Sequence, residues 1–158
     1  MHSRHTAAYS RGFTLIELMV TVVIATILLS IAIPSYQAQV RQSRRIEAKS
    51  AVLELAAREE RYLSTNPAAY TNNPANLGYQ AFNVPVGSGY YSLNVPCTPA
   101  CAPAGALANP SYTITAVPVA GAGQDKDSRC ASYSVDSTGK QYAADSTGAD
   151  NTVYCWGQ

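Results

Sequence analysis

Histidine is scarce in this 158-residue chain, and the two that occur, His2 and His5, both precede the first apolar run. Removal of the residues before that run would leave no histidine, which excludes a Ser/His catalytic triad and a histidine metal site. The chain also lacks a glycine-rich loop of the kind that cradles phosphates. We therefore expect a protein that is not an enzyme and that has no cofactor and no metal site.

A strong net charge is also absent, since the formal charge at pH 7 is +1. The region 65–158 is slightly acidic, which gives no electrostatic support to nucleic-acid binding. The segment Asp125–Asp127 could begin a calcium loop, but the ligand spacing does not continue, so we interpret it as a solvated turn. The charged residues of this region are Lys126, Arg129 and Lys140 against Asp125, Asp127, Asp136, Asp145 and Asp150.

Cysteine is missing from the amino-terminal half and occurs four times later in the chain. An even number of cysteines in a region rich in Gly, Pro, Ser, Thr and Asn indicates two disulfides formed in an oxidising compartment. A four-cysteine zinc site is the alternative, although the spacings lack paired C-x-x-C knuckles. The four are Cys97, Cys101, Cys130 and Cys155.

A long apolar run extends from Phe13 to Ile33. It is longer than the core of a secretory signal peptide, although cleavage near Ala38 is an alternative, and a buried core helix is another. Because about 20 apolar residues span the hydrocarbon core of a bilayer, we predict a membrane helix. The run contains one acid, Glu17, and a charge at membrane depth costs at least ~2.5 kcal/mol. Such a cost usually indicates a partner.

The orientation of this span has conflicting signals. Two basic residues precede it, Arg4 and Arg11, while Arg41, Arg44, Arg45 and Lys49 follow it. Counting positive charges would place the carboxy-terminal region in the cytoplasm. The four cysteines favour an oxidising compartment, and we give them more weight.

The helical pattern continues past the span, because no Gly or Pro occurs from Ser35 to Leu63. Pro34 removes one backbone hydrogen bond, so we expect a kink there. The whole helix would have about 50 residues and be roughly 75 Å long. Its second part, residues 34–64, should present an apolar stripe of Ile46, Leu53 and Ala56 with Val52, Leu55 and Tyr62 beside them.

Alternating strands follow the breakers of the segment Ser64–Tyr79 and a loop to Gly89. The alternation predicts that Tyr91, Leu93 and Val95 share one face of a strand, as do Tyr112, Ile114 and Ala116, and Ala131, Tyr133 and Val135. The segment Asp136–Lys140 predicts a hairpin turn before a short strand at 141–144. This is an α+β plan, in which the helix stripe covers one face of a small antiparallel sheet.

In the stretch "RGFTLIEL", Gly12 precedes the aromatic Phe13, and Glu17 is the fifth residue after the glycine. This stretch resembles the processing motif of type IV pilins. The likeness continues through "EAKSAVLELAAREERYL", "GYYSLNV", "SYTITAVPVAGAGQDKDSRC" and the terminal "YCW", and is greatest to PilE-like minor pilins. It implies the type IV pilin fold, with a cleaved leader 1–12, a span and filament-core helix 13–33, a helix 34–64 packed on the sheet, and a carboxy-terminal region 65–158.

The resemblance also implies processing and pairing. A prepilin peptidase would cut after Gly12, and the new amino group of Phe13 would be methylated. Cys130 and Cys155 match the cysteines that close a carboxy-terminal loop in the family. Cys97 and Cys101 have no counterpart in the basic pattern, and we predict that they form a second pair.

For Glu17, the same resemblance suggests a role in assembly. After cleavage, the carboxylate can pair with the Phe13 amine of a neighbouring subunit inside a bundle of apolar helices. A misplaced subunit would leave a charge unpaired, which costs several kcal/mol in a low-dielectric bundle. Glu17 would thus set the register between subunits.

We therefore predict a structural subunit of a type IV pilus, acting as a minor pilin in assembly, motility or adhesion. Expected partners are other pilins, the prepilin peptidase and an inner-membrane assembly platform, with no specific nucleic acid. The chain would cross the inner membrane once, its carboxy-terminal region in the periplasm, before joining a cell-surface pilus. Alternatives are a major pilin, a type II secretion pseudopilin, or a periplasmic binding domain or enzyme held by a signal anchor.

Overall fold

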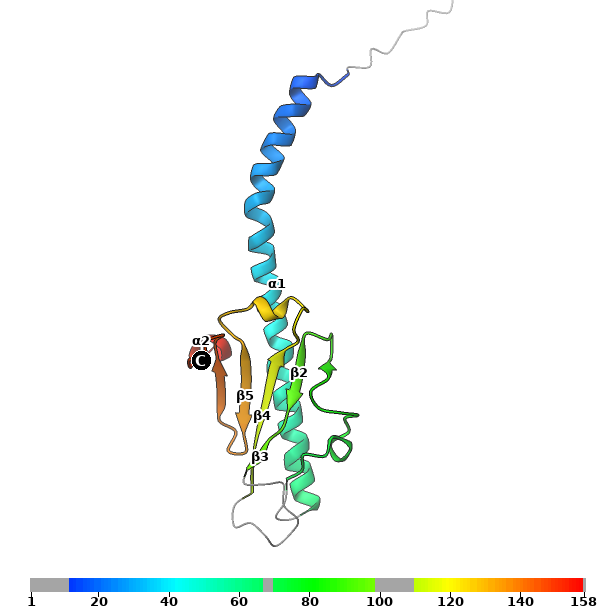
Figure 1. Ribbon diagram of the computed structural model, residues 1–158, viewed down its shortest axis with the longest axis vertical. Coiled ribbons are helices and arrows are strands. Elements are labelled where there is room, and N and C mark those ends of the chain that lie inside the picture. The colour runs from blue at the N-terminus through cyan, green and yellow to red at the C-terminus, as the bar shows by residue number, and fades with distance from the viewer. Residues whose placement is uncertain (1–11, 67–69, 99–109, 158) are drawn as a thin grey trace, which may run out of the picture. The chain divides into compact units, whose positions relative to one another are not determined.

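A computed structural model describes residues 12–66, 70–98 and 110–157 of the chain. The chain divides into two compact units, Met1–Gln39 and Val40–Gln158, and we call the second unit the head. One helix, α1 (Leu15–Thr65), contributes its first part to one unit and its second part to the other. Figure 1 follows the elements along the chain.

The first unit contains the apolar part of α1. The helix is long and apolar enough to cross a membrane, and the apolar side chains of this part are exposed to solvent in the isolated chain. Three hydroxyl groups within the run, those of Thr21, Thr26 and Ser30, each donate to a backbone carbonyl three residues earlier. These hydroxyls therefore have hydrogen-bond partners within the helix, as a lipid environment requires.

Pro34 lies inside α1, and helical backbone continues on both sides of it. The helix has 51 residues, close to the expected length. The kink predicted at Pro34 stays a prediction.

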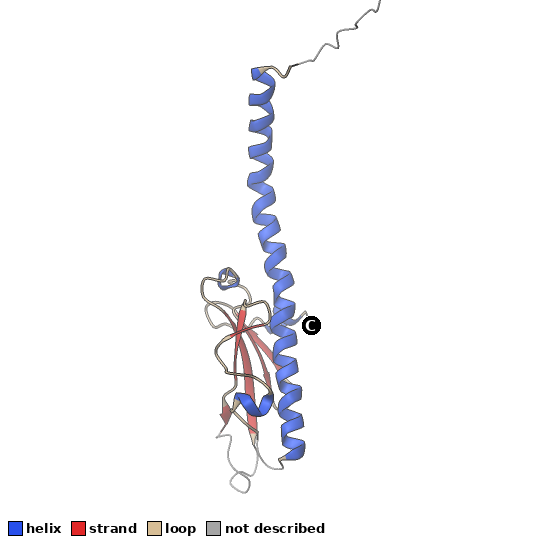
Figure 2. Ribbon diagram, turned by 90° about the vertical axis from the view of Figure 1, so that its right-hand side faces the viewer, coloured by secondary structure: helices blue, strands red, loops and turns tan. Residues whose placement is uncertain are grey.

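The second part of α1 packs on the sheet (Figure 2), and its buried face contains Val52 and Leu55 as predicted. Its buried residues are Ala48, Val52, Leu55 and Glu59. Successive members are three or four residues apart, so they form one line along the helix. The prediction that Ile46 and Leu53 join this face was wrong, because their side chains are 66% and 44% exposed.

The head contains an antiparallel sheet, as the alternation predicted. Strands are hydrogen-bonded in the order β1-β2-β4-β5-β6, and β3 also pairs with β4. The first and third strands were missed because each has two residues, too few for alternation to appear. The bounds are β1 Pro85–Val86, β2 Tyr91–Asn94, β3 Cys97–Thr98, β4 Ser111–Pro118, β5 Ser132–Asp136 and β6 Gln141–Ala144.

The predicted hairpin turn joins β5 to β6. The Asp136 side chain accepts hydrogen bonds from the Thr138 and Lys140 backbone N–H groups, which is a typical way for Asp to stabilise a turn. Gly139 has φ 80°, a left-handed conformation that favours glycine. This confirms that "DSTGK" is a turn.

The described part of the head also contains three short helices, none of which was predicted. They are η1 (Pro74–Leu77), η2 (Gln124–Lys126) and α2 (Thr152–Trp156). The core lies between the sheet and α1, where Tyr91 and Tyr133 meet edge-to-face with ring centroids 6.3 Å apart. The alternating side chains Ile114 and Val135 are also buried there. An α+β architecture with one long amino-terminal helix is therefore confirmed.

Candidate functional site

The predicted processing residues lie at the amino-terminal end of the first unit. Gly12 and Phe13 precede α1 in non-helical backbone, and Phe13 is 78% exposed. A peptidase needs such accessible, non-helical backbone at the bond that it cuts. Residues 1–11 of the predicted leader lie outside the described residues.

Glu17 lies in the first turn of α1 and is exposed. Its backbone N–H donates to Thr14 Oγ1 at 3.3 Å. The spacing Thr-x-x-Glu at the start of a helix is that of a capping box, and Thr14 makes the first of its two hydrogen bonds. This contribution of Thr14 was not predicted, although the capping-box spacing is present in the sequence. Among the described residues, the Glu17 carboxylate forms no ion pair.

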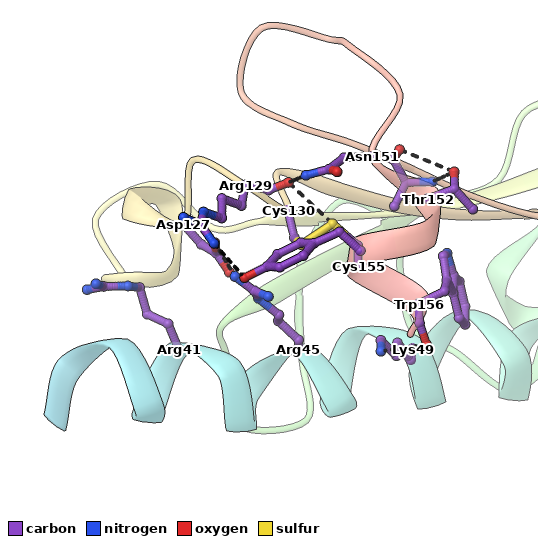
Figure 3. The surroundings of a disulfide bond; sticks show 12 residues. Arg41, Arg45, Lys49, Asp127, Arg129, Cys130, Asn151, Thr152, Cys155 and Trp156 are labelled. Carbon is purple, nitrogen blue, oxygen red and sulfur yellow. Dashed lines mark hydrogen bonds and ion pairs between the residues drawn. A yellow bond between two sulfur atoms is a disulfide. The ribbon is translucent and has the colours of Figure 1, made fainter. Parts of the chain in front are cut away.

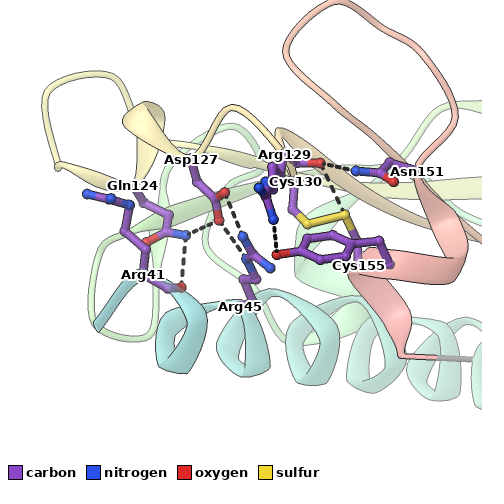
Figure 4. Close-up of polar contacts among 9 residues, drawn as sticks. Arg41, Arg45, Gln124, Asp127, Arg129, Cys130, Asn151 and Cys155 are labelled. Atoms are coloured by element: carbon purple, nitrogen blue, oxygen red, sulfur yellow. Dashed lines mark hydrogen bonds and ion pairs between the residues drawn. A yellow bond between two sulfur atoms is a disulfide. The ribbon is translucent and has the colours of Figure 1, made fainter. Parts of the chain in front are cut away.

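In the head, an ion pair between partly buried Arg45 and buried Asp127 ties α1 to the loop before β5 (Figure 4). Arg45 Nε and Nη2 donate to the two carboxylate oxygens of Asp127 at 2.7 and 2.8 Å. Gln124 Nε2 donates to the same carboxylate at 3.1 Å and to the Arg41 carbonyl at 3.2 Å. The hydrogen bonds with Asp127 raise the pKa of Arg45. This paired, bidentate geometry compensates for the cost of removing the two charges from most of their contact with water.

This ion pair corrects the interpretation of Asp125–Asp127 as a solvated turn. Asp125 and Lys126 are exposed, but Asp127 is buried and holds Arg45. The described part of the chain contains no cluster of three or more His, Cys, Asp or Glu side chains that could hold a metal ion.

A disulfide joins Cys130, just before β5, to Cys155 in α2 (Figure 3). It closes a segment of 25 residues and holds α2 against the sheet, as the resemblance implied for this pair. Asn151 Nδ2 donates to the Arg129 carbonyl at 2.9 Å and strengthens the same junction. Of the second predicted pair, Cys97 is disulfide-bonded, whereas Cys101 lies outside the described residues.

Cations and aromatic rings alternate around this disulfide. Arg129 donates to the Tyr154 hydroxyl at 3.0 Å, and its guanidinium lies 5.3 Å from the ring centroid. Hydrogen bonding by Arg45 and Arg129 lowers the pKa of Tyr154. We call this surface the disulfide corner. Its cation–ring pairs are Arg129 and Arg45 with Tyr154, Lys49 with Trp156, and Lys140 with Tyr142.

Glu59 is a buried acid near the carboxy-terminal end of α1. One carboxylate oxygen accepts the Thr71 backbone N–H at 3.2 Å, and the other has no hydrogen-bond partner within the described part of the chain. Burial raises the pKa of Glu59 to about 7. The next residue, Glu60, instead accepts hydrogen bonds from the hydroxyls of Tyr70 and Tyr112. No pattern in the sequence distinguishes these two acids.

Comparison with known families gives two matches. Residues 34–134, more than half of the chain, match the model of "Type IV minor pilin ComP, DNA uptake sequence receptor". Residues 8–33 match the prokaryotic N-terminal methylation motif. No curated protein sequence matches the chain. The two family matches adjoin each other and together cover the apolar helix, its continuation and most of the sheet.

Proposed function

We infer the function of this chain from its membership of the type IV minor pilin ComP family, and propose that it serves as a minor pilus subunit in fibre assembly. Pilins are structural subunits and not enzymes, they associate with other pilins, and the methylation motif implies processing by a prepilin peptidase. The observation that carries the proposal is the long helix α1. Its first part is an exposed apolar run, and its second part belongs to the head.

The disulfide of the head supports a periplasmic location. A bond between Cys130 and Cys155 needs an oxidising compartment, which the periplasm provides. The chain would therefore span the inner membrane through residues 13–33, with the head in the periplasm, and then pass to the fibre through an inner-membrane assembly platform. The basic residues that follow the span would make this orientation an exception to the positive-inside rule.

Glu17 supports the assembly step through its charge. Cleavage after Gly12 would create an α-amino group on Phe13, four residues before Glu17, and such a group is largely protonated near neutral pH. In a fibre core of apolar helices, this amine and the Glu17 carboxylate of a neighbour would neutralise each other. Such a contact joins one surface of a subunit to a different surface of the next. Repeating it builds an open helical fibre and not a closed ring.

Processing and location are tested by mass spectrometry of the chain recovered from sheared fibres. We expect an amino terminus at Phe13 carrying a methyl group, and a chain that is much less abundant than the main fibre subunit. Gly12→Leu should leave the uncleaved precursor in the membrane. An amino terminus near Gln39 would instead indicate ordinary secretion, and equal abundance with the other subunits would indicate a major pilin.

A second candidate function is DNA binding by the disulfide corner. The matching family is described as a DNA uptake sequence receptor, which the net charge of the chain gave no reason to expect. The corner supplies what DNA binding requires locally: cations for phosphates and exposed rings beside them. Arg129 and Lys140 are exposed, and Tyr154 and Tyr142 are 48% and 39% exposed.

This second function predicts a site-specific loss of DNA affinity. The affinity for DNA falls as salt rises. In the full-length chain in detergent, Arg129→Gln should make the slope of log affinity against log salt shallower by about 0.9, the value for one phosphate contact. Lys126→Gln removes the same charge from an exposed position that has no ring contact among the described residues, and should leave the slope unchanged. Fluorescence anisotropy with a labelled DNA duplex measures both. Equal effects of the two variants would reduce the interaction to non-specific charge attraction.

A further inference from the structure

A pocket lies on the head where the last turns of α1 meet the short helix η1, which runs beside them in Figure 2. Its volume is about 300 Å³, at the lower end of the range for sites that bind small molecules. It shares no residue with the disulfide corner. We call it the η1 pocket, and its lining residues are Arg58, Arg61, Tyr62, Thr65, Asn76, Leu77 and Gly78.

One wall of the η1 pocket is the side chain of Arg58, which is held in place by several contacts. Its Nη1 donates to the Leu77 carbonyl and its Nη2 to the Glu54 carboxylate, each at 2.6 Å. Its guanidinium also lies 4.8 Å from the centroid of the Tyr79 ring. Gly78 permits this arrangement, because a Cβ atom there would lie 2.6 Å from Arg58 Nη1. Arg58 therefore shapes the pocket, while Glu54 offsets its charge.

Arg61 supplies the charge of the η1 pocket that has no counterpart. Its side chain is exposed, and it forms no ion pair with any residue that the structure describes. It follows Arg58 by three positions, so the two lie on the same side of α1. A guanidinium presents its N–H donors in one plane, in a geometry that matches the two oxygens of a carboxylate. This part of the pocket therefore suits a ligand group with a single negative charge.

The other lining residues are uncharged and suit hydroxyl groups. Thr65 Oγ1 donates to the Tyr62 carbonyl at 3.0 Å and accepts from Asn66 Nδ2 at 3.0 Å, which leaves it one lone pair for a ligand. Asn76 Nδ2 donates to Thr71 Oγ1 at 3.1 Å, which holds the amide and leaves its oxygen as an acceptor.

The η1 pocket also has apolar surface between these polar groups. Leu77 is buried and Tyr62 is partly buried, and both line the pocket. A sugar ring has an apolar face of C–H groups that can pack on such a surface, while its hydroxyl groups point to the rim. One free cation, two acceptors and an aromatic ring thus lie within one small pocket.

We propose that the η1 pocket binds a sugar carboxylate, which is a monosaccharide unit with one carboxyl group. Arg61 binds the carboxylate, Thr65 and Asn76 accept hydrogen bonds from ring hydroxyls, and Tyr62 contacts the face of the ring. A DNA backbone is a poorer occupant, because it presents a row of phosphates on a convex surface. The site lies on the head of one subunit, so the proposal goes beyond the function in fibre assembly and does not depend on it.

A ligand-observed NMR titration of the full-length chain tests this site, in a detergent without a sugar headgroup. The probe is D-glucuronate, and D-glucose is the control that has the same ring without the carboxylate. We expect glucuronate to bind at least tenfold more tightly, because it adds charge-assisted hydrogen bonds to Arg61. Inorganic phosphate should bind more weakly than glucuronate, since it lacks the ring.

Substitution of the free cation tests which residue recognises the carboxylate. Arg61→Gln should weaken glucuronate binding about tenfold and leave glucose binding unchanged. Arg129→Gln removes the same charge from another exposed arginine of the head, outside the η1 pocket, and should change the affinity less than twofold. Formation of the Cys130–Cys155 disulfide in each variant shows that the head has folded.

Several results would overturn the sugar site. They include absence of glucuronate binding, equal binding of glucose, and an unchanged affinity after Arg61→Gln. Phosphate binding as tight as that of glucuronate would show a general anion site instead. Displacement of glucuronate by a DNA duplex would assign the pocket to a nucleic-acid surface. None of these results bears on fibre assembly, because the titration uses the isolated chain, and failure of the chain to enter fibres would leave the sugar site standing.

Discussion

Glu59→Gln should stabilise the head above pH 7, with a gain that disappears at acidic pH. The cause is the buried carboxyl group, whose pKa rises to about 7 in the folded chain from an ordinary value of 4.5. Between these two values the unfolded chain loses its proton while the folded chain retains it, so the free energy of unfolding falls as the pH rises. The loss is about 1.36 kcal/mol per pH unit and reaches about 3 kcal/mol above pH 7.

Glutamine has nearly the same shape as glutamate and stays neutral at every pH. It can also keep the hydrogen bond that Glu59 accepts from the Thr71 backbone. Denaturant unfolding of the full-length chain in detergent at pH 4.5 and pH 8 measures the difference. We expect the advantage of the variant to grow by about 3 kcal/mol between these conditions.

Glu54→Gln provides the matched control. It is the same substitution on the same helix, but the Glu54 side chain is 59% exposed and has no burial cost to relieve. It should not reproduce the pH-dependent gain of Glu59→Gln. A constant difference between Glu59→Gln and the unsubstituted chain at both pH values would mean that the folded head does not hold a proton on Glu59.

The strands of the head were predictable because each has one buried face. Tyr91 and Leu93, or Ile114 and Ala116, alternate with polar residues that face away from the core. The turn at Asp136–Lys140 was predictable from its Asp and Gly. The two-residue strands and the five-residue helix α2 contain too little sequence for any period to be recognised.

The packing face of α1 was harder to predict because the helix has two lines with similar spacing. One line contains Ala48, Val52 and Leu55, and the other contains Ile46 and Leu53. Because both lines contain apolar residues, the stripe predicted from the sequence combined members of the two lines. The sheet covers the line that contains Ala48, and which line it covers depends on residues far away in the sequence.

The polar contacts inside the head could not be predicted from the sequence for the same reason. Arg45 and Asp127 are 82 positions apart, and each resembles the exposed charges beside it. Only the fold brings them together. The methylation motif could be recognised from the sequence, because Gly12, Phe13 and Glu17 lie within a few residues of each other and belong to one continuous matching segment.

Glu17→Ala should nearly abolish entry of this chain into fibres while leaving its insertion in the membrane intact. Insertion should be equal or better, because the substitution deletes a costly charge from the span. Cleavage after Gly12 should continue, since Glu17 lies beyond the bond that is cut. Incorporation should fall because the Phe13 amine of the neighbouring subunit would be left without a partner in the apolar bundle, at a cost of several kcal/mol.

Two further variants separate charge from shape and from helix capping. Glu17→Gln keeps the volume and loses the charge, so it should fail in the same way as Glu17→Ala. Thr14→Ala removes the hydroxyl that accepts the Glu17 backbone N–H and should cost only about 1 kcal/mol of helix stability. Both Glu17 variants keep that N–H and therefore the hydrogen bond to Thr14, so the comparison separates loss of the carboxylate from loss of this bond.

The measurement co-expresses tagged variant and unsubstituted chains and compares their ratio in sheared fibres with their ratio in membranes. For the two Glu17 variants the fibre ratio should fall far below the membrane ratio, whereas for Thr14→Ala the two ratios should stay close. If both Glu17 variants enter fibres at the membrane ratio, the carboxylate sets no register and is only an acid tolerated near the end of the span. If Thr14→Ala fails as severely as they do, the start of the helix matters through its backbone geometry, and the ion pair is not the reason for the acid in the apolar run.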